Sequence, residues 1–360
     1  MEVPFLRELE ARILSATSTR TAACLTLEKG IYLARTGHLE SARDIGSRVR
    51  ASFNVQSEPE IYIWLTLLEG LIGFYSSATT RDRVKLQRAY ALADAIGRTD
   101  LMQYAAAWLA HHHFNMGRYH EMSRWLRESG LSQANNSSAR IRSCMTVADA
   151  WQFAGNNEVA SAWYAIARRT AAEIGDRASI MASIENRAAM RLDRIWLKSI
   201  DVSVGIDQIS EVESELLGGL AYEKFTESES LLYQALIWRS RLEVLKGDYA
   251  DALGTISSAS SELTSMQASL AFMHDIDLAW ICFKLGRLHD AKKSFGLAKN
   301  TPVDKFDMDD AAVYWKRMSV LDGELSDGVL AVEYSNRSGE ALASFYREVE
   351  DLAISIEEFR

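Results

Sequence analysis

The chain has few of the residues that interrupt helices or cross-link small folds. Among its 360 residues are only three prolines and three cysteines. The cysteines, Cys24, Cys144 and Cys282, are far apart and odd in number, and they form no Cys-x-x-Cys pair. This spacing argues against a disulfide framework or a zinc site and indicates reduced thiols in a cytoplasmic protein. So few prolines among many Ala, Leu, Glu and Arg residues predict a nearly all-helical chain.

The sequence also lacks a long apolar run, a signal peptide and a basic region. No apolar stretch approaches the length of a membrane span, and residues 1–14 carry five charged side chains. The net charge is −9, of which residues 300–360 carry −8. Direct nucleic-acid binding needs a basic patch, which this charge distribution does not provide. We therefore expect a cytoplasmic protein that binds neither membranes nor nucleic acid directly.

No sequence motif for catalysis, phosphate binding or metal binding occurs. The run His111–His113 cannot converge on one ion, because consecutive helical side chains point about 100° apart. The acidic run Asp307–Asp310 fits the first turn of a helix, where the helix dipole favours carboxylates. It lacks the glycine and the distal glutamate of a calcium-binding loop. We expect no catalytic residue, no cofactor, no metal and no enzymatic activity.

What the chain does have is a recurring phrase: a glycine, any residue, a bulky residue, two further residues and a small residue. It begins, with varying fidelity, at Gly37, Gly117, Gly155, Gly247, Gly286 and Gly323. Such a phrase is typical of the turn between two antiparallel helices. Three spacings are 37 to 39 residues, and the other two are about double. Further turns are therefore expected near Ser76–Thr80 and Lys198–Ser203, which gives about eight hairpins.

The repeated unit resembles the tetratricopeptide repeat, a helix–turn–helix of small and large positions. The best copy surrounds Gly286 and places Ala279, Ala291, Phe295 and Ala298 at the packing positions. The period near 39 exceeds that family's 34 residues and resembles the sensor arrays of large bacterial transcription activators. The resemblance implies an all-α fold, a right-handed α-solenoid of stacked antiparallel hairpins.

We expect three segments along the chain. Residues 1–19 would form an N-terminal capping helix, residues 20–338 the repeat array, and residues 339–360 an acidic amphipathic capping helix. That last helix could be a cap alone or an autoinhibitory segment that folds back into the groove. The segment Ser199–Val204 alternates polar and apolar residues, so a short strand is the alternative to the turn that the repeat demands there.

The resemblance implies that a partner lies along the concave face, which the first helix of each hairpin lines. The corresponding positions are Arg35, His111, Phe114, Asn115, Arg142, Asp149, Gln152, Phe153, Gln234, Arg241, Trp280 and Lys284. Arginine and lysine would bind carboxylates, amides would pair with an extended backbone, and aromatic rings would cover side chains.

This fold analogy predicts a non-enzymatic scaffold or adaptor for a protein or peptide. The alternative is a peptide- or ligand-sensing regulator that acts through a partner protein in signalling or transcription control. The sequence carries no signal for an oligomeric state.

Overall fold

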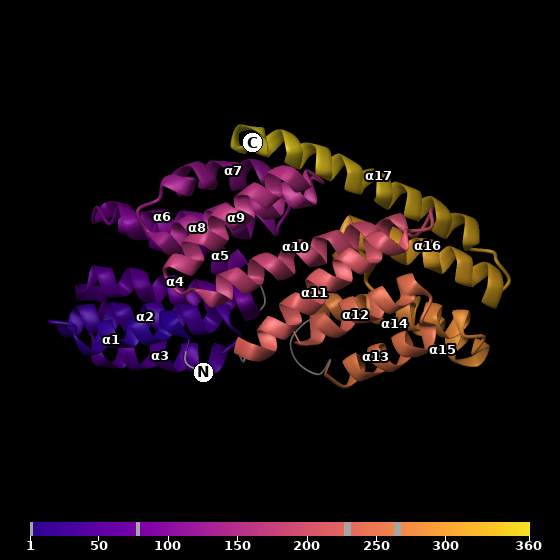
Figure 1. Ribbon diagram of the computed structural model, residues 1–360, viewed down its shortest axis with the longest axis horizontal. Helices are drawn as coiled ribbons and strands as arrows, with labels where there is room; N and C mark the ends of the chain where they lie inside the picture. Colours follow the sequence, from indigo (N-terminus) through magenta and orange to yellow (C-terminus); the bar gives the residue numbers. More distant parts are fainter. Residues whose placement is uncertain (1–2, 77–79, 227–231, 263–267) are drawn as a thin grey trace. The chain divides into compact units, whose positions relative to one another are not determined.

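A computed structural model of the chain describes residues 3–76, 80–226, 232–262 and 268–360 (Figure 1). These ranges form α-helices joined by turns and short 3-10 segments, and they contain no strand. The helices are α1 (Pro4–Leu14), α2 (Thr19–Arg35), α3 (Leu39–Ser52), α4 (Pro59–Ser76), α5 (Thr80–Ala95), α6 (Thr99–Phe114), α7 (Tyr119–Glu128), α8 (Ser137–Phe153), α9 (Asn157–Glu173), α10 (Arg177–Lys198), α11 (Ile206–Thr226), α12 (Leu232–Lys246), α13 (Tyr249–Glu262), α14 (Ala268–Lys284), α15 (Leu288–Ala298), α16 (Met308–Leu325) and α17 (Ala331–Ile356).

After α1, the helices form eight consecutive pairs from α2/α3 to α16/α17, as the glycine phrase predicts. Gly155 shows how the phrase works: its φ of 87° ends α8 in the left-handed region, which costs glycine nothing. The next residue, Asn156, then accepts the backbone N–H of Val159 and caps α9. Glycine and asparagine together therefore stop one helix and start the next.

One predicted turn is wrong. Gly323 lies inside α16, and the left-handed glycine that follows this helix is Gly328, with φ 72°. Leu321 and Leu325 are both buried and lie four residues apart, so the apolar face continues and extends the helix by about a turn. The carboxylate of Asp322 then accepts the backbone N–H of Leu330 at 2.9 Å and fixes the turn.

The two inferred breaks lie where the spacing places them. α4 ends at Ser76 and α5 begins at Thr80, and residues 77–79 lie outside the described part of the chain. α10 ends at Lys198, and α11 begins at Ile206. The segment between them is a turn followed by irregular backbone, so the strand alternative for Ser199–Val204 is wrong.

The chain divides into two compact units. Unit 1 comprises residues 1–186, 221–230 and 351–360, and unit 2 comprises residues 187–220 and 231–350. The assignment of residues 1–19 and 339–360 as caps stays a prediction. The helix that contains most of the second segment, α17, begins eight residues earlier, at Ala331.

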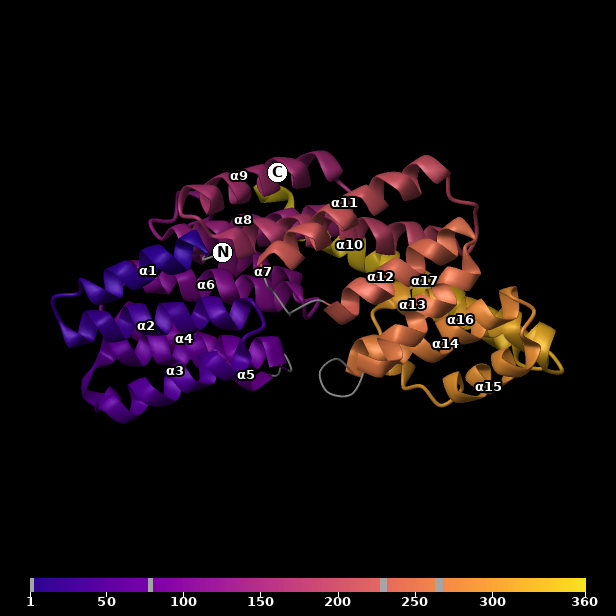
Figure 2. The ribbon, with the colours of Figure 1, turned by 60° about the horizontal axis from the view of Figure 1, so that its bottom comes forward.

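In unit 1, α2 packs against α4 and α6 packs against α8, whereas the hairpins α4/α5 and α6/α7 meet mainly through α5 and α6 (Figure 2). Small residues allow this close approach. A Cβ atom on Gly30 would lie 3.1 Å from side-chain atoms of both Ile45 and Leu68. Gly46 stands where the repeat usually has a large residue, because Leu65 and Leu68 of α4 already fill that space.

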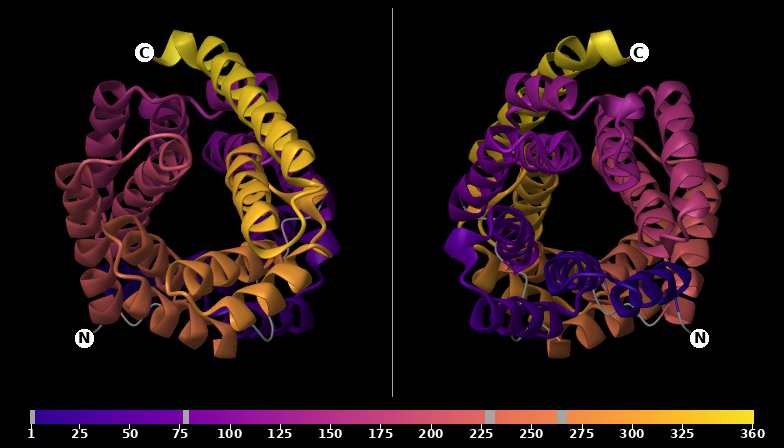
Figure 3. Two further views of the ribbon diagram at one scale, coloured as in Figure 1. Left: turned by 90° about the vertical axis from the view of Figure 1, so that its right-hand side faces the viewer. Right: turned by 90° about the vertical axis from the view of Figure 1, so that its left-hand side faces the viewer.

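The last ten residues of the sequence complete the core of unit 1. Leu352, Ile356 and Phe359 are buried in the same apolar cluster as the first four hairpins. The carbonyl oxygen of Phe359 accepts the indole N–H of Trp163 at 2.9 Å. Figure 3 shows this yellow end of α17 beside a purple helix of unit 1, consistent with the hydrogen bond from Ser123 of α7 to the Ser355 carbonyl. These residues therefore have a structural role in unit 1.

Candidate functional site

The predicted groove residues lie on first helices of the hairpins, with Asn115 directly after one. Unit 1 holds Arg35 on α2, His111 and Phe114 on α6, Asn115 after it, and Arg142, Asp149, Gln152 and Phe153 on α8. Unit 2 holds Gln234 and Arg241 on α12 and Trp280 and Lys284 on α14. The side chain of Gln234 lies outside the described part. The groove itself stays a prediction, and the structure shows how each of the other side chains is held.

Arg142 is a buried cation without an anionic partner. Its exposed fraction is 5%, and its guanidinium carbon lies 4.1 Å from the ring centroid of Trp108. Among the described residues, no carboxylate lies within ion-pair distance of it, and its Nε–H has no acceptor. Burial lowers the pKa of Arg142, while the surrounding Tyr75 and Asp149 oppose this shift. The stacked ring therefore holds a guanidinium whose buried Nε–H is unused among the described residues.

His111 lies on the same indole ring, with the two ring centroids 5.9 Å apart. Its Nδ1 atom is buried and has no partner in the described part of the chain. Burial and the charge of Arg142 hold the pKa of His111 well below its usual value. The imidazole is therefore neutral at pH 7 and can donate or accept a hydrogen bond without adding a second positive charge.

Asp149, by contrast, is already satisfied. It accepts the hydroxyl of Tyr164 at 2.6 Å and the side-chain amide of Asn186. Burial nonetheless raises the pKa of Asp149 to about 6, against the effect of these hydrogen bonds and of Arg142. Asp149 therefore fixes the packing of α8, α9 and α10 rather than offering a free carboxylate.

Arg35 is also engaged within the protein. Its guanidinium donates to both carboxylate oxygens of Asp176 and to the hydroxyl of Ser179. Asp176 in turn accepts the backbone N–H of Ser179 and so caps α10. The side chains of Arg35 and Asp176 are 7% and 1% exposed, which makes this a buried ion pair. Arg35 ties α2 to α10 within unit 1.

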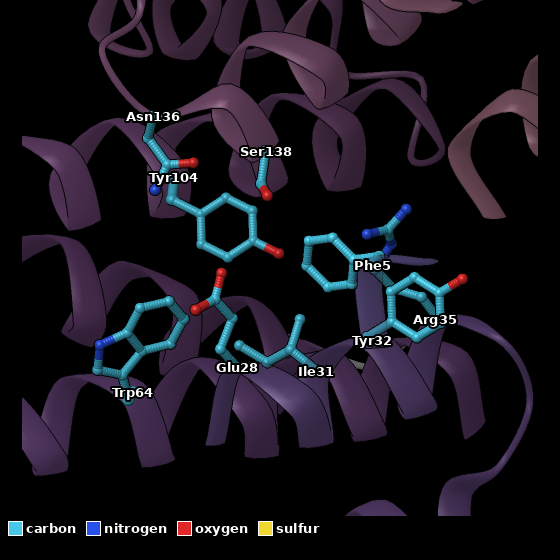
Figure 4. A pocket seen from close by; sticks show the side chains of 9 residues that line it. All are labelled: Phe5, Glu28, Ile31, Tyr32, Arg35, Trp64, Tyr104, Asn136 and Ser138. Atoms are coloured by element: carbon cyan, nitrogen blue, oxygen red, sulfur yellow. The ribbon is translucent and has the colours of Figure 1, made fainter. Parts of the chain in front are cut away.

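A small pocket lies beside this ion pair (Figure 4). Its lining residues are Phe5, Glu28, Ile31, Tyr32, Arg35, Trp64, Tyr104, Asn136 and Ser138. The carboxylate of Glu28 lies between the rings of Trp64 and Tyr104 in this view. The sequence analysis identified only Arg35 among them. The sequence does hold one sign of this pocket. The spacing of Glu28, Ile31 and Arg35 places an acidic and a basic side chain on the same face of one helix.

Some of the remaining predicted residues of unit 1 are packed against neighbouring side chains, and one is exposed to solvent. The rings of Phe114 and Phe153 meet edge to face, with centroids 6.3 Å apart. The side-chain amide of Gln152 donates to Asn157 at 2.7 Å. Asn115 is exposed. Phe114 and Phe153 therefore bridge two neighbouring hairpins, and Asn115 is open to solvent.

Unit 2 contains a second charged network, centred on Arg241. This guanidinium donates to Asp193 and Asp310, each at 2.9 Å, while Arg317 pairs with Asp277. The ring of Trp196 lies under both cations, 5.5 Å from Arg241 and 4.3 Å from Arg317. The helix-start interpretation of the acidic run also holds, because Asp309 and Asp310 lie in the first turn of α16. Arg241 is therefore bound to two carboxylates, unlike Arg142.

The other predicted residues of unit 2 are close to this network. The ring of Trp280 is 5.4 Å from the guanidinium carbon of Arg317, and the ammonium of Lys284 lies 4.7 Å from the same ring. Lys284 itself is exposed. The sequence analysis missed Asp193, Trp196, Asp277 and Arg317, which come from three different helices of unit 2.

The Asp193 carboxyl predicts a pH effect. Burial, together with the charge of Asp310, raises its pKa to about 6 despite Arg241. A carboxyl whose pKa is raised on folding stabilises the fold below its unfolded pKa, and this contribution is lost as the pH rises through 6. Its side chain is 36% exposed, so screening limits the effect to roughly 1 kcal/mol. Between pH 4 and 6 the wild type should lose stability relative to Asp193→Asn in urea unfolding. A rise in the stability of the wild type relative to Asp193→Asn between pH 4 and 6 would contradict the prediction.

The described residues contain no group of three or more His, Cys, Asp or Glu side chains that could hold a metal ion. His113 is buried, and burial lowers its pKa to about 4. Across the same described ranges, every helix is too short or too polar to cross a bilayer.

Comparison with known proteins identifies the fold. No family model and no curated protein matches the sequence. Among solved structures, the chain is similar to a Rap protein complexed with competence and sporulation factor, at 12% identity and a TM-score of 0.59. The alignment covers 95% of this chain and 100% of that chain. The apo form of RapI is 13% identical over 95% and 92% of the two chains, with a TM-score of 0.43. The chain thus has the all-α, solenoid fold of a tetratricopeptide-like helical repeat protein.

Proposed function

We propose that this protein is a non-enzymatic helical repeat protein that binds a peptide or an extended segment of a partner protein along the first helices of its hairpins. The observation that carries the proposal is Arg142. A guanidinium that is 5% exposed and has no carboxylate within ion-pair distance among the described residues costs free energy in the unbound protein. A carboxylate of a bound segment would accept its free N–H groups and remove that cost.

The surroundings of Arg142 suit such a segment. Trp108 holds the plane of the guanidinium, which limits the side-chain entropy lost on binding. The neutral His111 offers a second hydrogen-bonding group on the same ring. Phe114, about one turn beyond His111 on α6, meets Phe153 at the end of α8, and the two rings add aromatic surface. Hydrogen bonding from Arg142 with apolar cover beside it is the usual composition of a binding hot spot.

The likeness to a Rap protein complexed with competence and sporulation factor favours a second candidate function. In that version, binding a peptide or other ligand regulates a separate partner protein in signalling or transcription control. Both versions begin with the same binding step, so the first experiment is common to them.

The experiment uses a pool of random synthetic hexapeptides with free C-terminal carboxylates, captured on the protein and quantified by mass spectrometry. Arg142→Gln should reduce the recovered peptide at least about tenfold, because a hydrogen bond to a charged group contributes about 1.5–3 kcal/mol. Arg169→Gln, an exposed arginine on α9, is the matched control and should bind as the wild type does. Equal recovery on wild type and Arg142→Gln, or none on either, would refute the proposal.

A further inference from the structure

The pocket of Figure 4 contains the carboxylate of Glu28. Glu28 has no ion-pair or hydrogen-bond partner among the described residues. The nearby cation, Arg35, is held by Asp176 and is not available to it. Burial raises the pKa of Glu28, and the charge of Arg12 opposes this effect. The pocket therefore contains an acidic group with an unmet preference for a positive partner.

The other walls of the pocket suit a cation. The rings of Trp64 and Tyr104 flank the carboxylate, and the stacked rings of Phe5 and Tyr32 line the pocket toward Arg35 (Figure 4). The faces of aromatic rings attract cations, and the attraction strengthens when water is excluded. The hydroxyl of Ser138 supplies a neutral acceptor among the lining residues, while the side-chain oxygen of Asn136 caps α8. A carboxylate, aromatic rings and a polar acceptor together match the three donors of an ammonium group.

The size of the pocket narrows the choice of cation. Its cavity volume is about 10 Å³, which is room for one water-sized group. An ammonium group has this size, whereas the planar guanidinium of an arginine is several times larger. The dimensions therefore favour a primary amine.

We propose that the Glu28 pocket binds a primary ammonium group of the segment that unit 1 recognises, and this inference rests on the proposed function. The amine is either the N-terminal amino group or a lysine side chain. The charges of Glu28 and Arg142 both act on Tyr104, so unit 1 offers an anion and a cation near the same side chain. A segment with an amine and a carboxylate would complement both.

The test uses small probes of defined chemistry and follows the melting temperature of the full chain. Glycinamide presents an N-terminal amine, N-acetyl-lysinamide presents a side-chain amine, and N-acetyl-norleucinamide presents neither. At 10 mM, at least one amine should raise the wild-type melting temperature by about 2 °C, and norleucinamide should not. The amine that acts identifies the source of the ammonium group.

Glu28→Gln keeps the size of the side chain, removes its charge and should abolish the shift. Glu173→Gln, at an exposed position on α9, should retain it. Tyr104→Leu, which removes one ring without touching the carboxylate, should weaken it. No shift with either amine, an equal shift with norleucinamide, or an undiminished shift in Glu28→Gln would each overturn the inference. These results do not depend on the hexapeptide pool, so failure of the amine pocket is distinguishable from failure of peptide binding.

Discussion

Replacing Arg35 by methionine is expected to lower the free energy of unfolding by about 3–5 kcal/mol. The substitution keeps an unbranched apolar stem but removes the guanidinium and leaves Asp176, which is 1% exposed, as a buried charge without its cation. The hydrogen bonds from Ser179 remain and offset only part of that loss. Urea unfolding followed by circular dichroism would measure the effect.

The double variant Arg35→Met/Asp176→Asn supplies the control. Asparagine keeps an acceptor for the backbone N–H of Ser179, so α10 retains its cap while the isolated charge disappears. The double variant should therefore be more stable than Arg35→Met alone. If Arg35→Met lowers the free energy of unfolding by less than about 1 kcal/mol, Arg35 and Asp176 do not form the buried ion pair described above.

The second large effect is expected at the end of α17. Ile356 is fully buried in the core of unit 1, and Ile356→Ala should cost about 2–5 kcal/mol through lost contacts and the cavity left behind. The same unfolding measurement applies. It should show the loss even though residue 356 lies far in sequence from the helices that it packs against.

Ile354 is a matched control on the same helix. Its side chain is 66% exposed, so Ile354→Ala removes the same atoms from solvent rather than from a core. We expect a change within about 0.5 kcal/mol. Equal losses in the two variants would mean that the end of α17 does not pack into unit 1.

The fold could be predicted from local signals. A glycine such as Gly37 or Gly286 marks a left-handed residue at a helix end, and this requirement is visible in the sequence itself. The spacing of these glycines was enough to place the breaks near residues 77 and 200. The turn predicted at Gly323 was wrong because the glycine phrase alone does not distinguish a turn glycine from a glycine on the exposed side of a helix that continues.

The candidate site could be predicted only in part. Arg142 follows from the register of a first helix, because its position relative to Gly155 is fixed by the repeat. That it has no carboxylate partner is invisible in the sequence, as is the pairing of Arg35 with a residue 141 positions away. The Glu28 pocket was missed because Glu28, Trp64 and Tyr104 belong to three successive hairpins. These residues come together only when the three hairpins stack on one another in the folded protein.

The contribution of residues 351–360 to unit 1 has a consequence during synthesis on the ribosome. The first nine helices emerge early, but the indole N–H groups of Trp151 and Trp163 share an acceptor, the carbonyl of Phe359, that is made only after unit 2. At typical translation rates, the stretch from residue 187 to residue 350 takes roughly 10–30 s to make. During that interval unit 1 exposes the apolar surface that Leu352, Ile356 and Phe359 later cover. The nascent chain is therefore more open to chaperones, and more prone to aggregation, until residues 351–360 have been made and pack into unit 1.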